Sequence, residues 1–289
     1  MVNQTVAKKR KTPPAVIILA IALIFAAVTL AAFYFLGYRY IRTDKVKFIG
    51  KVVNGQPVSG LLSYANGEKA KLDYYNATIV FDNGDKYVGQ IKGLYRDGRG
   101  VMTYATTGDR YEGEFSQDEI TGTGTYTYAN GDVYTGSLLN SKMHGYGILV
   151  FASGDKYEGN FSNGLRSGSG VYTWKSGAKY DGSFVDDVKN GFGKMYYANG
   201  DYYEGQFVND KRQGSGYYRW ADGESYRGSF YNNLIDTRKV DGEGNFVKKD
   251  GKYVHGDMGV YTFANGRTYT GYFEAGEVVG VDFEIQPLQ

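Results

Sequence analysis

Several residue types that usually carry structure or chemistry are missing or rare in this 289-residue chain. It has no cysteine, which excludes disulfides, cysteine-bound zinc and a thiol nucleophile. It has only four prolines, and collagen, which needs proline and a strict three-residue period, is therefore excluded. His144 and His255 are its two histidines. Each precedes a glycine at an expected hairpin margin, and we interpret both as solvated loop residues.

Motifs for catalysis are missing too. The sequence contains no phosphate-binding string of the form Gly-x-x-x-x-Gly-Lys-Ser/Thr. With two histidines and no cysteine, no zinc site is expected beyond a mixed carboxylate one. The acidic pairs Asp118-Glu119 and Asp186-Asp187 fall in expected loops and are interpreted as solvated, whereas general acid–base catalysis needs a carboxyl group shifted by burial. We therefore expect no enzyme activity, no metal and no cofactor.

Glycine and tyrosine are abundant instead, with 42 Gly and 29 Tyr. Disordered chains are poor in aromatic residues, so this combination indicates tightly turned, repetitive β structure. The charges are segregated. Residues 1–38 hold four basic residues and no acid, whereas 25 basic and 30 acidic residues remain from Phe48 onward, a net charge of −5. A nucleic-acid-binding domain would carry a basic stripe, so we expect no nucleic-acid partner.

One long apolar segment runs from Ala15 to Leu36, with Thr29 and Tyr34 as its only partly polar members. A helix of this length spans about 33 Å, enough to cross a hydrocarbon core of roughly 30 Å. The alternative is a cleaved signal peptide, whose apolar region has about 7–15 residues. Because this segment is longer, we predict an uncleaved signal-anchor, a single-pass transmembrane helix over residues 15–38.

The charges on either side of this segment predict its orientation. Five positive charges precede the segment: the terminal amine and the four basic residues at 8–11. Four basic residues follow it within residues 39–47. The positive-inside bias then favours a cytoplasmic N-terminus. The rest of the chain is expected outside the cytoplasm, at the plasma membrane.

A repeat of about 23 residues occupies most of the remaining chain. The string Gly-Asp-x-Tyr-x-Gly recurs with variants, and a Gly-x-Gly pair recurs in step with it. Two motifs that stay in phase over six periods indicate a repeat architecture. The leading glycines are Gly84, Gly108, Gly131, Gly154, Gly177, Gly200, Gly223 and Gly266.

Each repeat is predicted to be a β-hairpin. A three-residue loop over Ala129–Gly131, closed by a left-handed glycine, pairs Tyr126 with Tyr134 and Gly124 with Gly136. One face then carries Gly, Tyr and Leu, and the other carries Thr, Val and Ser. The aspartates that follow the turn glycine are expected to form local hydrogen bonds rather than to bind calcium. They are Asp85, Asp109, Asp132, Asp155 and Asp201.

Stacked hairpins align aromatic residues into columns. Because glycine lacks a Cβ, a neighbouring ring can lie flat over its backbone, and at least three stacked hairpins make a continuous layer. The first column is Tyr87, Tyr111, Tyr134, Tyr157, Tyr180, Tyr203, Tyr226 and Tyr269. The second is Phe115, Leu138, Phe161, Phe184, Phe207, Phe230 and Phe273. The third, near the Asn-Gly loops, is Tyr128, Phe151, Trp174, Tyr197 and Trp220.

The repeat resembles the MORN (membrane occupation and recognition nexus) family. The strings that carry the resemblance are DKYVG at 85–89, DRYEGEF at 109–115, DKYEGNF at 155–161, DYYEGQF at 201–207 and TYTGYF at 268–273. It covers about residues 78–275 and implies an all-β fold, an elongated single-layer antiparallel sheet with one hairpin per repeat. Family members mostly act as non-catalytic scaffolds, membrane-associated linkers or appendages to enzymes. Some are appended to lipid kinases, so a kinase-like name could arise by repeat similarity only.

Three regions depart from the pattern. A degraded unit over 48–82 is expected to form an N-terminal cap, residues 231–257 interrupt the register with a distorted hairpin, and residues 278–286 alternate as a strand that protects the sheet edge. The predicted parts are a basic cytoplasmic N-terminus (1–14), a transmembrane helix (15–38), a juxtamembrane segment with a degenerate capping repeat (39–77), regular repeats (78–230), an irregular insertion (231–257), and the last repeat with a capping strand (258–289).

The predicted function is a membrane-anchored, non-catalytic scaffold that binds an unidentified protein partner at the cell envelope. The alternatives are a glycan- or lipid-binding module and an accessory subunit of a membrane enzyme, although the net charge of −5 argues against anionic headgroups. Trp174, Tyr197 and Trp220 are the candidate partner-binding residues, because an uncovered aromatic strip tends to mark an interaction site. That site could equally be a homodimer face.

Overall fold

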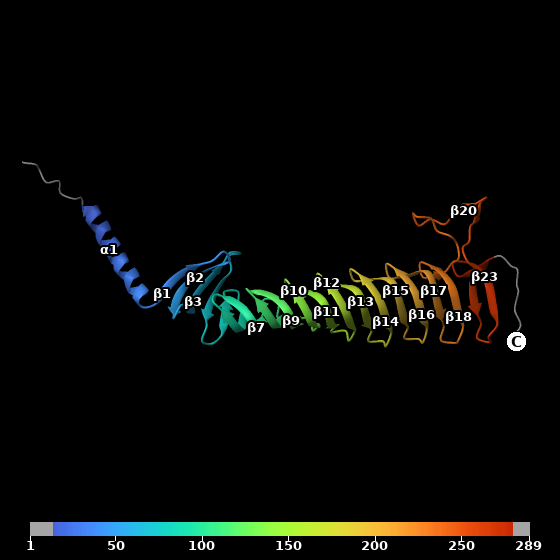
Figure 1. Cartoon of the computed structure of the whole chain (residues 1–289), viewed down its shortest axis with the longest axis horizontal. Helices are drawn as coiled ribbons and strands as arrows, with labels where there is room; N and C mark the ends of the chain where they lie inside the picture. Colours follow the sequence, from blue (N-terminus) through green and yellow to red (C-terminus); the bar gives the residue numbers. More distant parts are fainter. Residues whose placement is uncertain (1–13, 280–289) are drawn as a thin grey trace, which may run out of the picture. The chain divides into compact units, whose positions relative to one another are not determined.

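The computed structural model describes residues 14–279, which fall into two compact units divided between Thr106 and Thr107. Within each unit, consecutive strands pair antiparallel to form a single open layer, so the all-β prediction is confirmed (Figure 1). The basic cluster at residues 8–11 and the part of the expected capping strand beyond residue 279 lie outside the described residues.

The first unit begins with the apolar helix α1 (Pro14–Phe35). Its side chains are exposed and its mean hydropathy is 3.0, so it is long and apolar enough to cross a membrane. The helix ends before the predicted boundary at Tyr38, because Gly37 adopts a left-handed φ of +88° and the chain turns directly into a strand. The strands of this unit are β1 (Tyr38–Arg42), β2 (Val46–Val53), β3 (Gln56–Tyr64), β4 (Lys69–Asp73), β5 (Thr78–Phe81), β6 (Lys86–Lys92) and β7 (Tyr95–Thr103).

The second unit is a ladder of hairpins. Its regular strands are β8 (Arg110–Ser116), β9 (Glu119–Thr127), β10 (Val133–Leu139), β11 (Lys142–Val150), β12 (Lys156–Ser162), β13 (Leu165–Thr173), β14 (Lys179–Val185), β15 (Val188–Tyr196), β16 (Tyr202–Val208), β17 (Lys211–Arg219) and β18 (Ser225–Tyr231). Shorter strands complete it: β19 (Leu234–Ile235), β20 (Lys248–Lys249), β21 (Lys252–Tyr253), β22 (Gly259–Thr262), β23 (Thr268–Glu274) and β24 (Glu277–Val279).

The Asn-Gly loops have the predicted geometry. The Gly131 amide donates to the Tyr128 carbonyl at 2.9 Å, the Tyr128 amide donates to the Asp132 carbonyl at 2.9 Å, and Gly131 has a φ of +93°. Tyr126 pairs with Tyr134 and Gly124 pairs with Gly136. The three-residue loop and its register are therefore confirmed.

At the opposite end, the strands are joined by two-residue turns in which both residues have positive φ. This conformation matches the right-handed twist of paired strands, and Asn, Asp and Gly tolerate it best. The turns are Gln117-Asp118, Asn140-Ser141, Asn163-Gly164, Asp186-Asp187, Asn209-Asp210 and Asn232-Asn233. The acidic residues in these turns therefore suit the backbone conformation.

The first aromatic column forms the core. Tyr111, Tyr134, Tyr157, Tyr180, Tyr203 and Tyr226 of the second unit are completely buried, and the Phe column beside them is 2–5% exposed. Each tyrosine ring lies over a pair of glycines on neighbouring strands, as Tyr157 does over Gly159 and Gly170. Its hydroxyl donates to the carbonyl three residues later, at 2.9 Å from Tyr157 to Asn160. The predicted ring-over-glycine packing is therefore confirmed.

The insertion after β18 interrupts the sequence repeat but leaves the pairing register of the sheet intact. Strand β18 pairs with β19 at one end and with β22 at the other. The short strands β19 and β22 therefore take the place of one regular strand beside β18. The inserted residues include the small hairpin β20–β21, which stands out from the sheet (Figure 1). Buried Asp236 holds the guanidinium of Arg238 at 2.6 Å, and that guanidinium lies 3.7 Å from the Phe246 ring.

Candidate functional site

The third aromatic column, here called the turn-proximal strip (Tyr128, Phe151, Trp174, Tyr197 and Trp220), is half-buried. It lies on the same face as the buried tyrosines, at the edge next to the Asn-Gly loops. The Trp174 ring lies 4.6 Å from Tyr172, and the Trp220 ring lies 4.8 Å from Tyr218. One side of each indole therefore packs on the sheet's own aromatic side chains, while part of it faces solvent.

A cavity of about 240 Å³ opens beside Trp174. The Arg166 guanidinium lies 5.2 Å from the Tyr172 ring and 5.3 Å from the Phe184 ring, and the Lys189 ammonium lies 5.7 Å from the Trp174 ring. Cations over aromatic faces are attracted by the ring quadrupole. The lining residues are Arg166, Tyr172, Trp174, Phe184, Asp187, Lys189 and Asp210.

Asp187 in this cavity is not the solvated loop acid that we expected. Its carboxylate accepts from Arg166 through the amide at 2.9 Å and through Nε at 2.8 Å, and Arg166 Nη2 donates to the Asp187 carbonyl. Lys189 Nζ lies 3.6 Å from an Asp210 oxygen in the same way. The turn acid of one hairpin thus ties down a cation of the preceding hairpin. Sequence reasoning missed this contact because the partners are 21 residues apart.

The aspartates after the turn glycines also act between hairpins rather than only within the turn. Asp201 accepts from the Ala221 amide at 2.9 Å and from the Tyr218 hydroxyl at 2.6 Å, both in the next hairpin. Within the turn, the Asp201 backbone amide donates to Asn199 Oδ1 at 3.1 Å. Although burial raises the pKa of Asp201, these hydrogen bonds lower it overall. The stabilisation is therefore present above the ordinary pKa of 3.8 and is lost as the pH falls below it.

Asp201→Ala is expected to lower the free energy of unfolding by about 1–2 kcal/mol, because it leaves the buried Tyr218 hydroxyl without its acceptor. Urea denaturation followed by circular dichroism measures this loss. Asp181→Ala, at an exposed strand position, is the matched control and should change stability by less than about 0.5 kcal/mol. Equal effects from both variants would contradict a role for Asp201 between hairpins.

The two histidines differ in environment. His144 is exposed on β11, whereas His255 is not a solvated loop residue. Its Nδ1 lies 2.9 Å from the Thr237 hydroxyl, its Nε2 lies 3.2 Å from a Glu274 oxygen, and its ring packs against Tyr272. These contacts hold the insertion against the last hairpin.

Within residues 14–279, no group of three or more His, Asp or Glu side chains is arranged to hold a metal ion.

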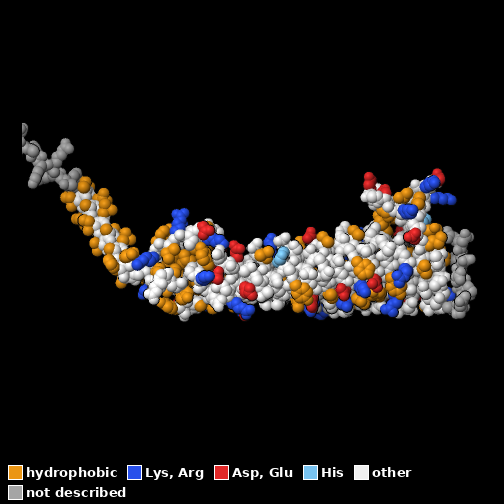
Figure 2. Space-filling view, in the orientation of Figure 1, with side chains coloured by type: hydrophobic (Ala, Val, Ile, Leu, Met, Phe, Trp, Pro, Cys, Tyr) orange, Lys and Arg blue, Asp and Glu red, His pale blue; other side chains and the backbone are white. Residues whose placement is uncertain are grey.

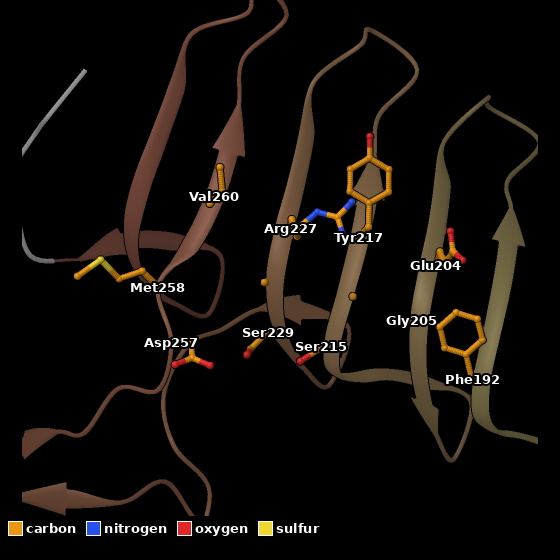
Figure 3. A pocket seen from close by; sticks show the side chains of 12 residues that line it. Phe192, Glu204, Gly205, Ser215, Tyr217, Arg227, Ser229, Asp257, Met258 and Val260 are labelled. Atoms are coloured by element: carbon orange, nitrogen blue, oxygen red, sulfur yellow. The ribbon is translucent and has the colours of Figure 1, made fainter. Parts of the chain in front are cut away.

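A second cavity, of about 560 Å³, lies on the opposite face of the second unit (Figure 3). Its floor is made of small residues such as Ser215 and Ser229, and Phe192 and Met258, about half exposed, stand at its two sides. The Arg227 guanidinium lies 4.9 Å from the Tyr217 ring. Sequence reasoning missed this cavity because its residues come from three hairpins and the insertion.

Comparison with known proteins identifies the repeats. The MORN repeat family matches residues 87–108, 111–133, 134–156, 157–179, 180–202 and 203–225. MORN repeat-containing protein 3 of Xenopus laevis is 33% identical over 89 residues, which cover 29% of this chain and 36% of that protein. The chain thus spans about a third of the length of this curated relative.

Two solved structures show a weak similarity to this chain. The TCP10 domain of Danio rerio CPAP, in complex with a STIL peptide, is 13% identical with a TM-score of 0.40, over 77% of this chain and 92% of that one. The TCP10c domain of Drosophila melanogaster Sas-4 is 19% identical with a TM-score of 0.33, over 60% and 99%. The family match and the hairpin ladder together show that residues 87–225 are six MORN repeats and that the chain is a MORN-repeat protein.

Proposed function

We propose that this chain is a membrane-anchored scaffold that binds a protein partner through the turn-proximal strip and acts by binding rather than by catalysis. The observation that carries the proposal is the row of half-buried rings, with Trp174 and Trp220 at two of its positions. Trp and Tyr combine a large apolar area with a hydrogen-bonding edge, which suits an interface anchor.

The cavity beside Trp174 supports a protein partner more than a purely apolar ligand. It combines Trp174 and Tyr172 with two cations and two acids. An aromatic centre with a polar, charged rim is typical of protein–protein interfaces. The acids of the rim already hold Arg166 and Lys189 in place, so the surface is ordered before a partner arrives.

Trp174→Ala and Trp220→Ala are each expected to weaken partner binding by more than about 1 kcal/mol, roughly fivefold in affinity, while the β circular-dichroism signal stays intact. The full chain, with a photo-crosslinking residue at exposed position 175, would be crosslinked in its native membranes. Mass spectrometry would identify the partner, and the yield of the crosslinked product would measure how much binding each variant loses.

Phe192→Ala is the matched control, because Phe192 is 50% exposed on the opposite face. It should crosslink normally. If the main product is a dimer of this chain, the strip is a homodimer face. Normal binding by both tryptophan variants would show that the strip is only packing, and unfolding of both would show that it is core.

For the anchor, we propose that α1 spans the plasma membrane with its N-terminus in the cytoplasm and the repeats outside. The support is the length and hydropathy of the helix together with the flanking charges. A reporter that is active only outside the cytoplasm, fused after Gln289, is expected to be active. Silence of this reporter, with activity of a cytoplasmic reporter at the same position, would contradict the orientation.

A further inference from the structure

The sheet of the first unit has two very different faces. Alternate residues of its strands are buried on the inner face, among them Val46, Phe48, Leu62, Ala70, Leu72 and Ile79. The residues between them point the other way and are mostly exposed. We call this second side, formed by β1 to β6, the outer face.

The outer face is strongly cationic. Its strand positions carry one acid, Asp73, whose carboxylate accepts hydrogen bonds from Asn76. The nearby acids Asp44, Glu68, Asp82 and Asp85 lie in the loops between strands. Seven exposed cations share the face, and none of them forms an ion pair among the described residues: Arg42, Lys47, Lys51, Lys69, Lys71, Lys86 and Lys92.

An apolar ridge crosses the middle of these cations. Tyr40 pairs with Ile49, and Ile49 pairs with Leu61, so the three side chains lie side by side on β1, β2 and β3. They are 60%, 60% and 55% exposed. Lys71 lies next in the same row, opposite Leu61. Figure 2 shows hydrophobic and basic side chains mixed in the part of the chain that follows the helix.

The outer face begins close to the end of α1. Three residue steps separate Phe35 from Tyr38, which is at most about 11 Å of chain. Arg39 links the end of the helix to the first strand. Its Nη1 donates to the carbonyls of Tyr34 and Tyr38, and its guanidinium lies 3.8 Å from the Tyr34 ring. With α1 across the bilayer, the start of the outer face, where Lys51 pairs with Tyr38, lies about one Debye length, about 8–10 Å, from the membrane surface.

We propose that the outer face binds the anionic headgroups of the bilayer that α1 crosses. The proposal rests on the membrane anchoring proposed above. Lysine ammonium groups attract phosphate, and an exposed apolar ridge between them can enter the boundary between headgroups and acyl chains. A soluble polyanion such as a nucleic acid would satisfy the cations but leave the ridge in water. The net charge of −5 beyond Phe48 conceals this face, because most of the acids that it counts lie in the second unit.

The test uses the full chain in lipid nanodiscs, either of phosphatidylcholine alone or with added phosphatidylglycerol. Because the chain has no cysteine, Leu61→Cys provides a single site for an environment-sensitive dye. We expect phosphatidylglycerol to shift the emission to the blue and to reduce quenching by aqueous iodide about fivefold, and high salt to reverse both changes. A dye at Asp181→Cys, in the second unit, should not respond.

Charge variants sharpen the test. Changing Lys47, Lys51 and Lys71 together to Glu is expected to abolish the response at position 61, whereas changing the same three residues to Arg preserves it. These side chains are exposed, so both variants should keep the same circular dichroism.

The outcomes separate this proposal from the anchor. Entry into the discs without any effect of phosphatidylglycerol would overturn the lipid-binding face and leave the anchor standing. Failure to enter either disc would overturn both. Protection of the dye by an oligonucleotide or heparin, but not by anionic discs, would also overturn it and assign the face to a soluble polyanion.

Discussion

Gly170→Ala is expected to destabilise the second unit by about 2–3 kcal/mol. A Cβ at this position would lie 2.3 Å from the Tyr157 hydroxyl oxygen and 2.6 Å from its ring carbons. Tyr157 is completely buried and hydrogen-bonded to the Asn160 carbonyl, so the ring cannot move aside without losing that bond. The midpoint of urea denaturation, followed by circular dichroism, measures the effect.

Gly242→Ala is the matched control. It makes the same chemical change in the insertion, where an added Cβ meets no atom within 4 Å. Neither glycine has the left-handed φ that would strain an alanine. The control should change stability by less than about 0.5 kcal/mol. A similarly small loss for Gly170→Ala would contradict the view that ring-over-glycine contacts hold the ladder together.

The second unit is also expected to lose stability steeply at alkaline pH. Burial raises the pKa of Tyr134 and Tyr157 from 10.0 to about 12, and it also raises the pKa of Tyr180, Tyr203 and Tyr226. Between pH 10 and 12 the unfolded chain releases protons that the folded chain retains. The free energy of unfolding therefore falls as the pH rises, whereas below pH 10 these groups contribute no pH dependence.

Each such tyrosine contributes up to about 1.4 kcal/mol per pH unit above pH 10. Tyrosinate absorbance and circular dichroism, recorded together during an alkaline titration, should change in one cooperative transition. Tyr157→Phe removes one of these groups, so its stability should fall less steeply with pH, although it starts lower because a hydrogen bond is lost. Gradual ionisation of the tyrosines without unfolding would contradict the prediction.

The hairpin ladder could be predicted because the residues that define it repeat. The pairing of Tyr126 with Tyr134 follows from the period of two along a strand and from one left-handed glycine, both of which are local. The buried tyrosine column follows from the same register, since the repeat carries each ring to the same face.

Features that depend on contacts between hairpins could not be predicted. Asp187 lies in a turn whose polar residues are typical of a solvated loop. Only the stacking of hairpins brings Arg166 Nε within 2.8 Å of its carboxylate. His255 was misinterpreted for the same reason, because Thr237 and Glu274 reach it from separate segments. The outer face of the first unit was hidden by counting charge over the whole chain rather than over one side of a sheet. The role of Trp174, Tyr197 and Trp220 in binding stays a prediction.

The way in which the insertion enters the sheet has a consequence for how such repeats can diversify. The chain leaves the sheet after Ile235, the last residue of β19, and re-enters it at Gly259, the first residue of β22. Both β19 and β22 pair with β18. Neighbouring hairpins change register at the equivalent position, as between Gly205 and Phe207 of β16. Each of these irregularities is thus a place where chain can be added without shifting any column of rings. New loops for recognition could accumulate there one hairpin at a time, while the tyrosine–glycine core stays unchanged.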